Sequence, residues 1–69
     1  MNELILIGKR IRFIRLEKGM SIEDLSLESN VNRNYISDLE RGKRNPSIKV
    51  LLRLAKALEV SLSDIVKGV

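Results

Sequence analysis

The chain of 69 residues contains no cysteine and no histidine. Without cysteine it can form neither a disulfide nor a thiolate metal site, which suits a reducing cytosol. Without histidine, a general base at neutral pH would need a carboxylate or lysine of strongly shifted pKa. The sequence also lacks a phosphate-cradling glycine loop and a nucleophile paired with a base. We therefore expect no metal, no cofactor and no enzymatic activity.

Long apolar runs are lacking too. Near the start, only Leu4 to Ile7 are consecutively apolar, and Lys9 and Arg10 follow at once. Such a run is too short for a signal segment or a membrane span. We find no internal repeat, linker or low-complexity segment. The sequence thus predicts a cytoplasmic protein with no membrane association and a single domain over residues 1–69.

The charge of the chain is moderately basic, with thirteen Lys and Arg against nine Asp and Glu. Residues 41–49, RGKRNPSIK, contain four of these cations and no acid. A basic segment of this kind favours an anionic partner. The alternative is a basic loop that only keeps the protein soluble.

The first helix is predicted over residues 3–18, and Gly19 is suited to end it. Its core face is given by apolar residues spaced three and four apart: Leu4, Ile7, Ile11 and Ile14. Arg15 lies at the edge of this face, so it needs an acceptor, for which Glu40 is the candidate, or it must extend to solvent.

Leu6 and Phe13 fall on the opposite side of this helix. They are interpreted as a patch that meets a partner. The alternative is that the N-terminal residues are not helical and that the C-terminus of the chain covers Phe13. Small apolar patches are ordinary on protein surfaces, so the pattern does not choose between these two.

Two short helices joined by a tight turn are predicted between Ser21 and Gly42. Ser21 can cap the first helix with Asp24 as its reciprocal partner. Asn30 tolerates the left-handed backbone of a sharp reversal, and Asn32 can cap the second helix. About three residues of turn are characteristic of a DNA-binding helix-turn-helix.

The second of these helices has one apolar face, formed by Ile36 and Leu39. The opposite face is wholly polar, with Arg33 at its flank, and carries Asn34, Ser37, Asp38 and Arg41. This mixture suits base edges and phosphates. An ordinary solvated helix face would look the same, so the pattern alone leaves both interpretations open.

After Gly42 the chain forms a loop in which Pro46 prevents helix until Ser47 can cap the next one, predicted over residues 48–58. That helix is expected to bury Leu51, Leu54, Ala55 and Leu58, and its first amides can attract phosphate. Ser61 and Asp64 begin a last short helix. Its apolar residues are expected partly to close the core and partly to form a dimer surface: Leu62, Ile65, Val66 and Val69.

Two long segments, IGKRIRFIRLEKGMSIEDLS and NRNYISDLERGKRNPSIKVLLRLAKALEVSLSDI, resemble the two halves of the Cro/cI-type, or XRE, helix-turn-helix family. The stretch RNYISDLERGKRNPS is most similar to restriction-modification controller proteins and short phage-type repressors. The resemblance implies an all-α fold, a compact five-helix bundle of the lambda-repressor-like type. In that family the third helix enters the major groove and the second crosses the backbone.

Site residues follow from the same resemblance, position by position. Asp38 would accept from cytosine or steady Arg33, and Arg15 and Glu40 match an internal ion pair. The base-contacting positions are Arg33, Asn34, Ser37 and Asp38. The phosphate-contacting positions are Tyr35, Arg41, Lys43, Arg44, Asn45, Ser47 and Lys49.

Three positions depart from the family's pattern. Ile22 stands where relatives often have a glutamine that reaches a phosphate, so that anchor is expected to be missing. Ser26 replaces an alanine, and its hydroxyl needs an acceptor such as the preceding turn of its own helix. Asn30 replaces a glycine, which is sterically permissible.

The sequence therefore predicts a sequence-specific transcriptional regulator that binds double-stranded DNA, as a repressor or controller protein, with no small-molecule ligand. We expect a homodimer on a palindromic operator whose half-sites lie about 34 Å apart. The alternative is an antitoxin-like module that binds a partner protein through Leu6, Phe13 and the C-terminal apolar residues.

Overall fold

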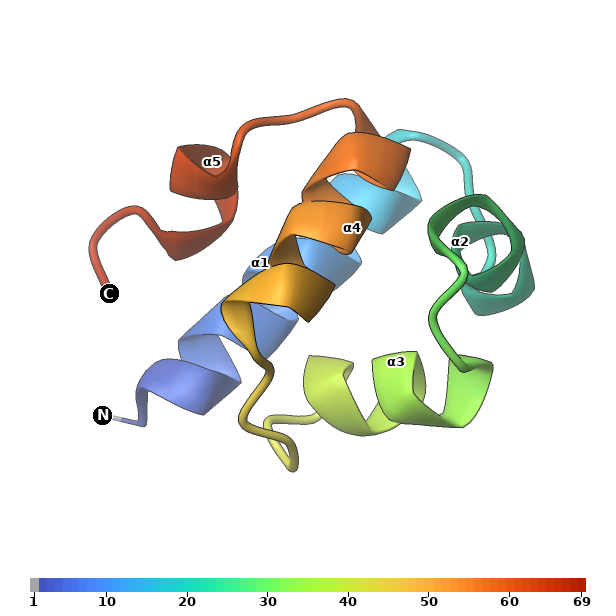
Figure 1. The fold of residues 1–69 in the computed structure, drawn as a ribbon. Coiled ribbons are helices and arrows are strands. Elements are labelled where there is room, and N and C mark those ends of the chain that lie inside the picture. Colours follow the sequence, from blue (N-terminus) through green and yellow to red (C-terminus); the bar gives the residue numbers. More distant parts are fainter. Residues whose placement is uncertain (1) are drawn as a thin grey trace.

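The computed structural model describes residues 2–69 and contains α-helices but no strand within them (Figure 1). The helices are α1 (Glu3–Glu17), α2 (Ile22–Ser29), α3 (Arg33–Glu40), α4 (Ile48–Leu58) and α5 (Leu62–Val66). Helices α2 and α3 lie together on one side and α5 on the other, and α1 packs against both α3 and α5. The predicted all-α, five-helix fold is confirmed. Among the helices described, none has the length and apolarity needed to cross a bilayer.

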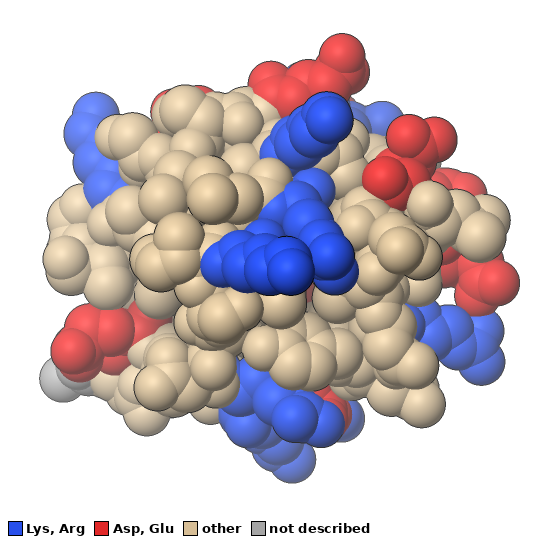
Figure 2. Space-filling model, in the orientation of Figure 1, with Lys and Arg blue, Asp and Glu red and all other residues tan. Residues whose placement is uncertain are grey.

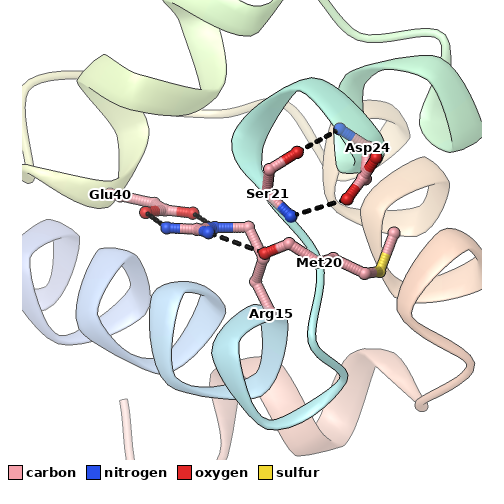
Figure 3. A network of polar contacts seen from close by, with 5 residues as sticks. All are labelled: Arg15, Met20, Ser21, Asp24 and Glu40. Carbon is pink, nitrogen blue, oxygen red and sulfur yellow. Dashed lines mark hydrogen bonds and ion pairs between the residues drawn. The ribbon is translucent and has the colours of Figure 1, made fainter.

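The N-terminal caps predicted from the sequence are present. Ser21 and Asp24 form a capping box, in which each backbone N–H donates to the other residue's side chain at 2.9 Å (Figure 3). The pKa of the Asp24 carboxyl is lowered, mainly by the hydrogen bond from the Ser21 backbone N–H and to a smaller extent by the Ser21 side chain. The remaining predicted caps are Asn32, Ser47 and Ser61.

The predicted helix ends are also found. Asn30 closes α2 in the left-handed conformation, with φ 58°. Gly19 and Gly42 follow α1 and α3 with φ of 70° and 75°. Behind Gly42, the Lys43 N–H donates to the Asp38 carbonyl at 2.9 Å, so the chain turns sharply at the end of α3. The reversals on both sides of α3 are thus fixed by local chemistry.

The hydrophobic core draws residues from every helix. The largest side chains that are fully buried are Ile11, Leu25, Ile36, Leu39, Leu54, Leu58 and Ile65. The predicted core face of α4 is confirmed, whereas Leu4 on α1 is only partly buried. Burial of this kind contributes roughly 1.5–3 kcal/mol for each large aliphatic side chain.

Our prediction that Ile65 belongs to a partner surface is wrong. Its side chain is 0% exposed, because α5 packs against both α1 and α4 and turns Ile65 into the core. Leu62 and Val66 pack against the core and remain partly exposed, while Val69 is 47% exposed. Helix α5 therefore closes the core and still presents apolar atoms outside.

Arg15 and Glu40 form the predicted ion pair between α1 and α3. Arg15 Nε and Nη2 donate to the two Glu40 carboxylate oxygens at 2.7 and 2.9 Å. Arg15 Nη1 also donates to the Met20 carbonyl at 2.8 Å, as Figure 3 shows. The side chains of the pair are only 6% and 3% exposed, so the alternative that Arg15 extends to solvent is wrong. The hydrogen bond with Glu40 raises the pKa of the guanidinium, against the effect of burial.

The close approach of α1 to α3 depends on Gly8, a residue that the sequence analysis did not single out. A Cβ atom at Gly8 would lie 2.3 Å from the Leu39 carbonyl oxygen and 2.8 Å from that of Glu40. Both atoms belong to backbone and cannot rotate away. Gly8 therefore allows the last turn of α3 to rest directly on α1.

Phe13 lies on a continuous helix and is 62% exposed, so both parts of our alternative, a non-helical start and a covered Phe13, are wrong. Arg10, between Leu6 and Phe13 on this side of α1, donates through Nη1 to the carbonyls of Asp64 and Lys67 at 3.3 and 2.8 Å. It therefore fastens the end of α5 to α1. We define the apolar face as the incompletely buried apolar residues on this side of α1, on α5 and after α5. They are Leu6, Phe13, Leu62, Val66 and Val69.

Candidate nucleic-acid interface

The turn between α2 and α3 is held by side-chain hydrogen bonds. The Ser26 hydroxyl donates to the Val31 carbonyl at 2.6 Å, across the turn. Our prediction that Ser26 bonds its own preceding turn is thus wrong, because the reversal at Asn30 brings a free carbonyl within reach. The Ser29 hydroxyl donates to the Leu25 carbonyl at 2.6 Å. The Ser29 oxygen also accepts from the Val31 N–H at 3.3 Å, so Ser26 and Ser29 together tie Val31 in the turn to the end of α2.

The inner face of α3 is anchored in the core, where Ile36 and Leu39 are fully buried. Its outer face is left to solvent at Arg33 and Asn34, and partly so at Ser37 and Asp38. A shallow depression of about 280 Å³ lies between the start of α2 and this face, and it is lined by Ile22, Glu23, Arg33, Asn34 and Ser37. The structure thus brings three of the four predicted base-contacting residues together.

Arg33 is paired with a residue that the sequence analysis did not connect with it. Its Nη1 donates to Glu23 Oε1 at 2.7 Å, and the two side chains are 66% and 58% exposed. The prediction that Asp38 steadies Arg33 is therefore wrong. No local spacing rule relates residues ten apart on different helices, and only the packing of α2 on α3 reveals the pair. An exposed pair of this kind adds about 0–1 kcal/mol of stability, so Arg33 can exchange it for another acceptor.

Asp38 contacts cations that follow it in the chain. Its Oδ1 accepts from Arg41 Nη2 at 2.7 Å, and its Oδ2 lies 3.7 Å from Arg44 Nε. The Arg44 guanidinium also lies 4.9 Å from the centre of the Tyr35 ring, a cation–π distance. The Arg41 hydrogen bond is the main cause that lowers the pKa of the Asp38 carboxyl, and nearby cationic charges add to it. The loop after α3 is therefore folded back onto the outer face of α3.

Apart from Tyr35, which lies within α3, the predicted phosphate-contacting residues lie on this loop and at its two ends. Tyr35 is half-buried, and the others are exposed: Arg41, Lys43, Arg44, Asn45, Ser47 and Lys49. The Ser47 oxygen accepts from the Val50 N–H at 3.1 Å, which leaves its hydroxyl proton free to donate. Figure 2 shows basic side chains gathered at the lower edge of the molecule, where the loop between α3 and α4 lies, and a second group over α4.

A second depression, of about 690 Å³, lies between α2 and α4, away from the outer face of α3. Its charged lining mixes both signs, with Glu28 and Glu59 against Arg53 and Lys56. It therefore has no evident preference for an anion or a cation. Within residues 2–69, no group of three or more acidic side chains is placed to hold a metal ion.

Comparison with known proteins agrees with this geometry. A family model described as helix-turn-helix matches residues 11–65. The control protein C.BamHI of Bacillus amyloliquefaciens is 45% identical over 65 residues, which cover 93% of this chain and 80% of that protein.

Two solved structures are similar over most of the chain. The restriction-modification controller protein C.AhdI from Aeromonas hydrophila has a TM-score of 0.91 and 37% identity, covering 94% of this chain and 98% of its own. The controller protein C.Esp1396I, solved as a tetramer in complex with its natural 35 base-pair operator, has a TM-score of 0.83 and 49% identity. The match covers 88% of this chain and 80% of the C.Esp1396I chain.

Proposed function

The chain belongs to the helix-turn-helix family, in its Cro/cI-type branch with the restriction-modification controller proteins, and we propose that it regulates transcription by binding double-stranded DNA in a sequence-specific way. The observation that carries the proposal is the exposed polar face of α3, set beside an exposed basic loop and held by a rigid turn. The relatives are named as controllers and regulators, which does not favour the antitoxin-like alternative or an enzyme.

Three residues on the outer face of α3 are assigned to base reading. Arg33, at the first turn of α3, presents two donors to the O6 and N7 acceptors of guanine. Asn34 suits the donor and acceptor pair of adenine, and Ser37 can pair with either base. Their common depression allows the three side chains to reach neighbouring base pairs.

The strand contacts are assigned to the loop and to the start of α4. Lys43 and Lys49 make no ion pair among the described residues, and Asn45 is exposed, so their donors are open to phosphate. Ser47 lies at the N-terminus of α4, where unpaired amides and the helix dipole favour an anion. Ile22 at the start of α2 offers no hydrogen bond, so α2 contributes less to this grip than it does in relatives with a glutamine there.

Changing Arg33 to alanine is expected to weaken binding to a selected sequence by about 1–3 kcal/mol, and to relax the preference at one base-pair position. Changing Lys43 to alanine is expected to weaken binding to all DNA sequences by the same factor, because a phosphate contact carries no sequence information. The measurement is fluorescence anisotropy with duplexes selected from a random pool, repeated at several salt concentrations.

The salt series gives the control for this pair of variants. Lys43→Ala should lower the slope of log affinity against log salt by about 0.9, the value for one phosphate. If Arg33→Ala bound the selected and unrelated duplexes as wild type does, the base-reading assignment would be wrong. A selection that enriches no sequence would remove the claim of specificity altogether.

We also propose that the protein acts as a homodimer on a palindromic operator. One small module makes few contacts, and two modules joined by symmetry double them at half-sites about 34 Å apart. We assign the contact between subunits to the apolar face, because Phe13 is a large side chain that is 62% exposed on α1, and α5, which packs against α1, also carries incompletely buried apolar residues. The operator complex of C.Esp1396I is itself a tetramer, which supports an assembly of more than one copy.

Changing Phe13 to lysine is expected to raise the dissociation constant of the dimer at least about tenfold, since a charge would enter the apolar contact. Leu27→Lys is the matched control, because Leu27 is 77% exposed on α2, outside the apolar face. Sedimentation equilibrium measures the dimer dissociation constant of both variants. If Leu52→Lys on α4 separated the subunits and Phe13→Lys did not, the contact would lie on the exposed pair Ile48 and Leu52 instead.

A further inference from the structure

We propose that Asp38 reads no base but acts as an internal competitor for DNA phosphate, which holds Arg41 and Arg44 and so lowers the affinity of the protein for every duplex. The inference rests on the proposed function, because it concerns the same DNA-facing surface. It changes the role that the family resemblance implies for Asp38.

The first step is that both carboxylate oxygens of Asp38 are already engaged. Oδ1 accepts from Arg41 at 2.7 Å, and Oδ2 faces Arg44 Nε at 3.7 Å. A cytosine amino group would have to use a lone pair that the two guanidiniums leave free, on a carboxylate whose charge they already offset. An anion bound to two cations is a poor free acceptor for a neutral base.

The second step is that the arginines have the chemistry to exchange partners. A guanidinium binds phosphate in the same forked geometry as carboxylate. The Arg41 and Arg44 side chains are 59% and 51% exposed, so a strand can reach them without unfolding the loop. Asp38 thus occupies the place that a phosphate would take.

The third step is the position of the cluster beside the proposed reading surface. Asp38 follows Ser37 on α3, and Arg44 stacks on Tyr35, one turn earlier on the same helix. A strand close enough to touch these arginines lies close to the Asp38 charge. The carboxylate must then give up its partners and tolerate a second anion nearby, and like charges at short range are unfavourable.

The effect is independent of sequence, because the exchange takes place wherever a phosphate meets the two arginines. The cost of releasing them enters the binding free energy of a selected duplex and of an unrelated one equally. A base reader would behave differently, since its removal alters the preference at one position. This contrast makes the two roles separable by experiment.

The test compares Asp38→Asn with Glu17→Gln, which removes the same charge from the exposed last residue of α1. Glu17 forms no ion pair with any residue from 2 to 69. Asp38→Asn is expected to tighten binding to selected and unrelated duplexes by the same factor, about five- to tenfold, from release of the ion pairs and the phosphate repulsion. Glu17→Gln should change either affinity by less than about twofold, because its distant charge is screened. Anisotropy at fixed salt measures all four affinities, and a thermal melt confirms that each variant is folded.

The Arg41→Ala background supplies the decisive comparison. There, Asp38→Asn should have a smaller effect, measured as the logarithm of the affinity ratio, because one of the two held arginines is absent while Arg44 and the phosphate repulsion remain. Equal effects in both backgrounds would overturn the proposal. So would an Asp38→Asn variant that loses only the selected sequence, which would make Asp38 a base reader, or one that matches Glu17→Gln.

Elution from a heparin column distinguishes this proposal from the proposed function. Heparin is a sulfated polyanion with no bases, so it tests the cationic side chains without any base contact. Asp38→Asn should elute at higher salt than Glu17→Gln, with the difference reduced in the Arg41→Ala background. That result together with no binding to any duplex would reject DNA binding and keep Asp38 as a competitor for anions. Identical elution of the two charge variants would reject the competitor role, whatever the duplexes show.

Discussion

Replacing Arg15 with methionine is expected to lower the free energy of unfolding by about 3–5 kcal/mol, because one member of a buried ion pair would be left alone. The Glu40 side chain is only 3% exposed and would lose the two hydrogen bonds that it accepts from Arg15. The Met20 carbonyl would lose its donor as well. Small domains have total stabilities on the order of 5 kcal/mol, so the variant should retain at most about 2 kcal/mol and melt well below wild type. Urea and thermal denaturation followed by circular dichroism measure the loss.

Two variants serve as controls for this result. Arg33→Ala removes an arginine whose side chain is 66% exposed in a pair of the same 2.7 Å length, and it should cost less than about 1 kcal/mol. The double variant Arg15→Met with Glu40→Met should recover most of the lost stability, because neither charge then remains in the core. If Arg15→Met cost no more than Arg33→Ala, the buried pair would contribute nothing beyond an ordinary surface contact.

Features governed by neighbours in the chain could be predicted from the sequence. The cap at Ser21 and the left-handed turn at Asn30 follow from the hydrogen-bonding and backbone preferences of single residues. The burial of Ile11 and Leu54 follows from apolar spacing along one helix. The Arg15 and Glu40 pair came from the helix wheel and from the family resemblance together. These rules were enough to place the outer face of α3.

Features that depend on how two helices meet could not be predicted in the same way. Glu23 reaches Arg33 only because α2 and α3 pack at a particular register, and nothing in their spacing indicates it. Ile65 has the same apolar character as Val66, so only the docking of α5 decides which of them is enclosed.

The Asp38 cluster is a different case, because the sequence contained the signal. Asp38 and Arg41, the residue directly after α3, are three positions apart, a spacing at which opposite charges meet. We instead connected Asp38 with Arg33, five positions before it, on the strength of the resemblance. Local spacing was the better guide here.

Changing Gly8 to alanine is expected to lower the free energy of unfolding by about 3 kcal/mol, the upper end of the usual cost of overpacking. Helix preference alone would stabilise alanine by about 0.5–1 kcal/mol, because Gly8 lies inside α1. The new methyl group, however, would lie 2.3 Å from the Leu39 carbonyl oxygen. The atom in its way is backbone, so α1 and α3 must separate and loosen the packing between them. Thermal denaturation should show a drop of more than 10 °C, at about 4–8 °C for each kcal/mol.

Two neighbouring variants separate the steric effect from backbone effects. Lys9→Ala, next to Gly8 and exposed, should stay within about 0.5 kcal/mol of wild type. At Gly19 a Cβ would meet no atom within 4 Å, but φ is 70°, so Gly19→Ala should cost about 1–2 kcal/mol from conformation alone. If Gly8→Ala were as stable as wild type or more so, the contact between α1 and α3 would be adjustable. In that case Gly8 would not fix the position of α3, and the folded variant should bind the selected duplex as tightly as wild type. With a rigid contact, any folded Gly8→Ala fraction holds α3 displaced from α1 and binds that duplex more weakly.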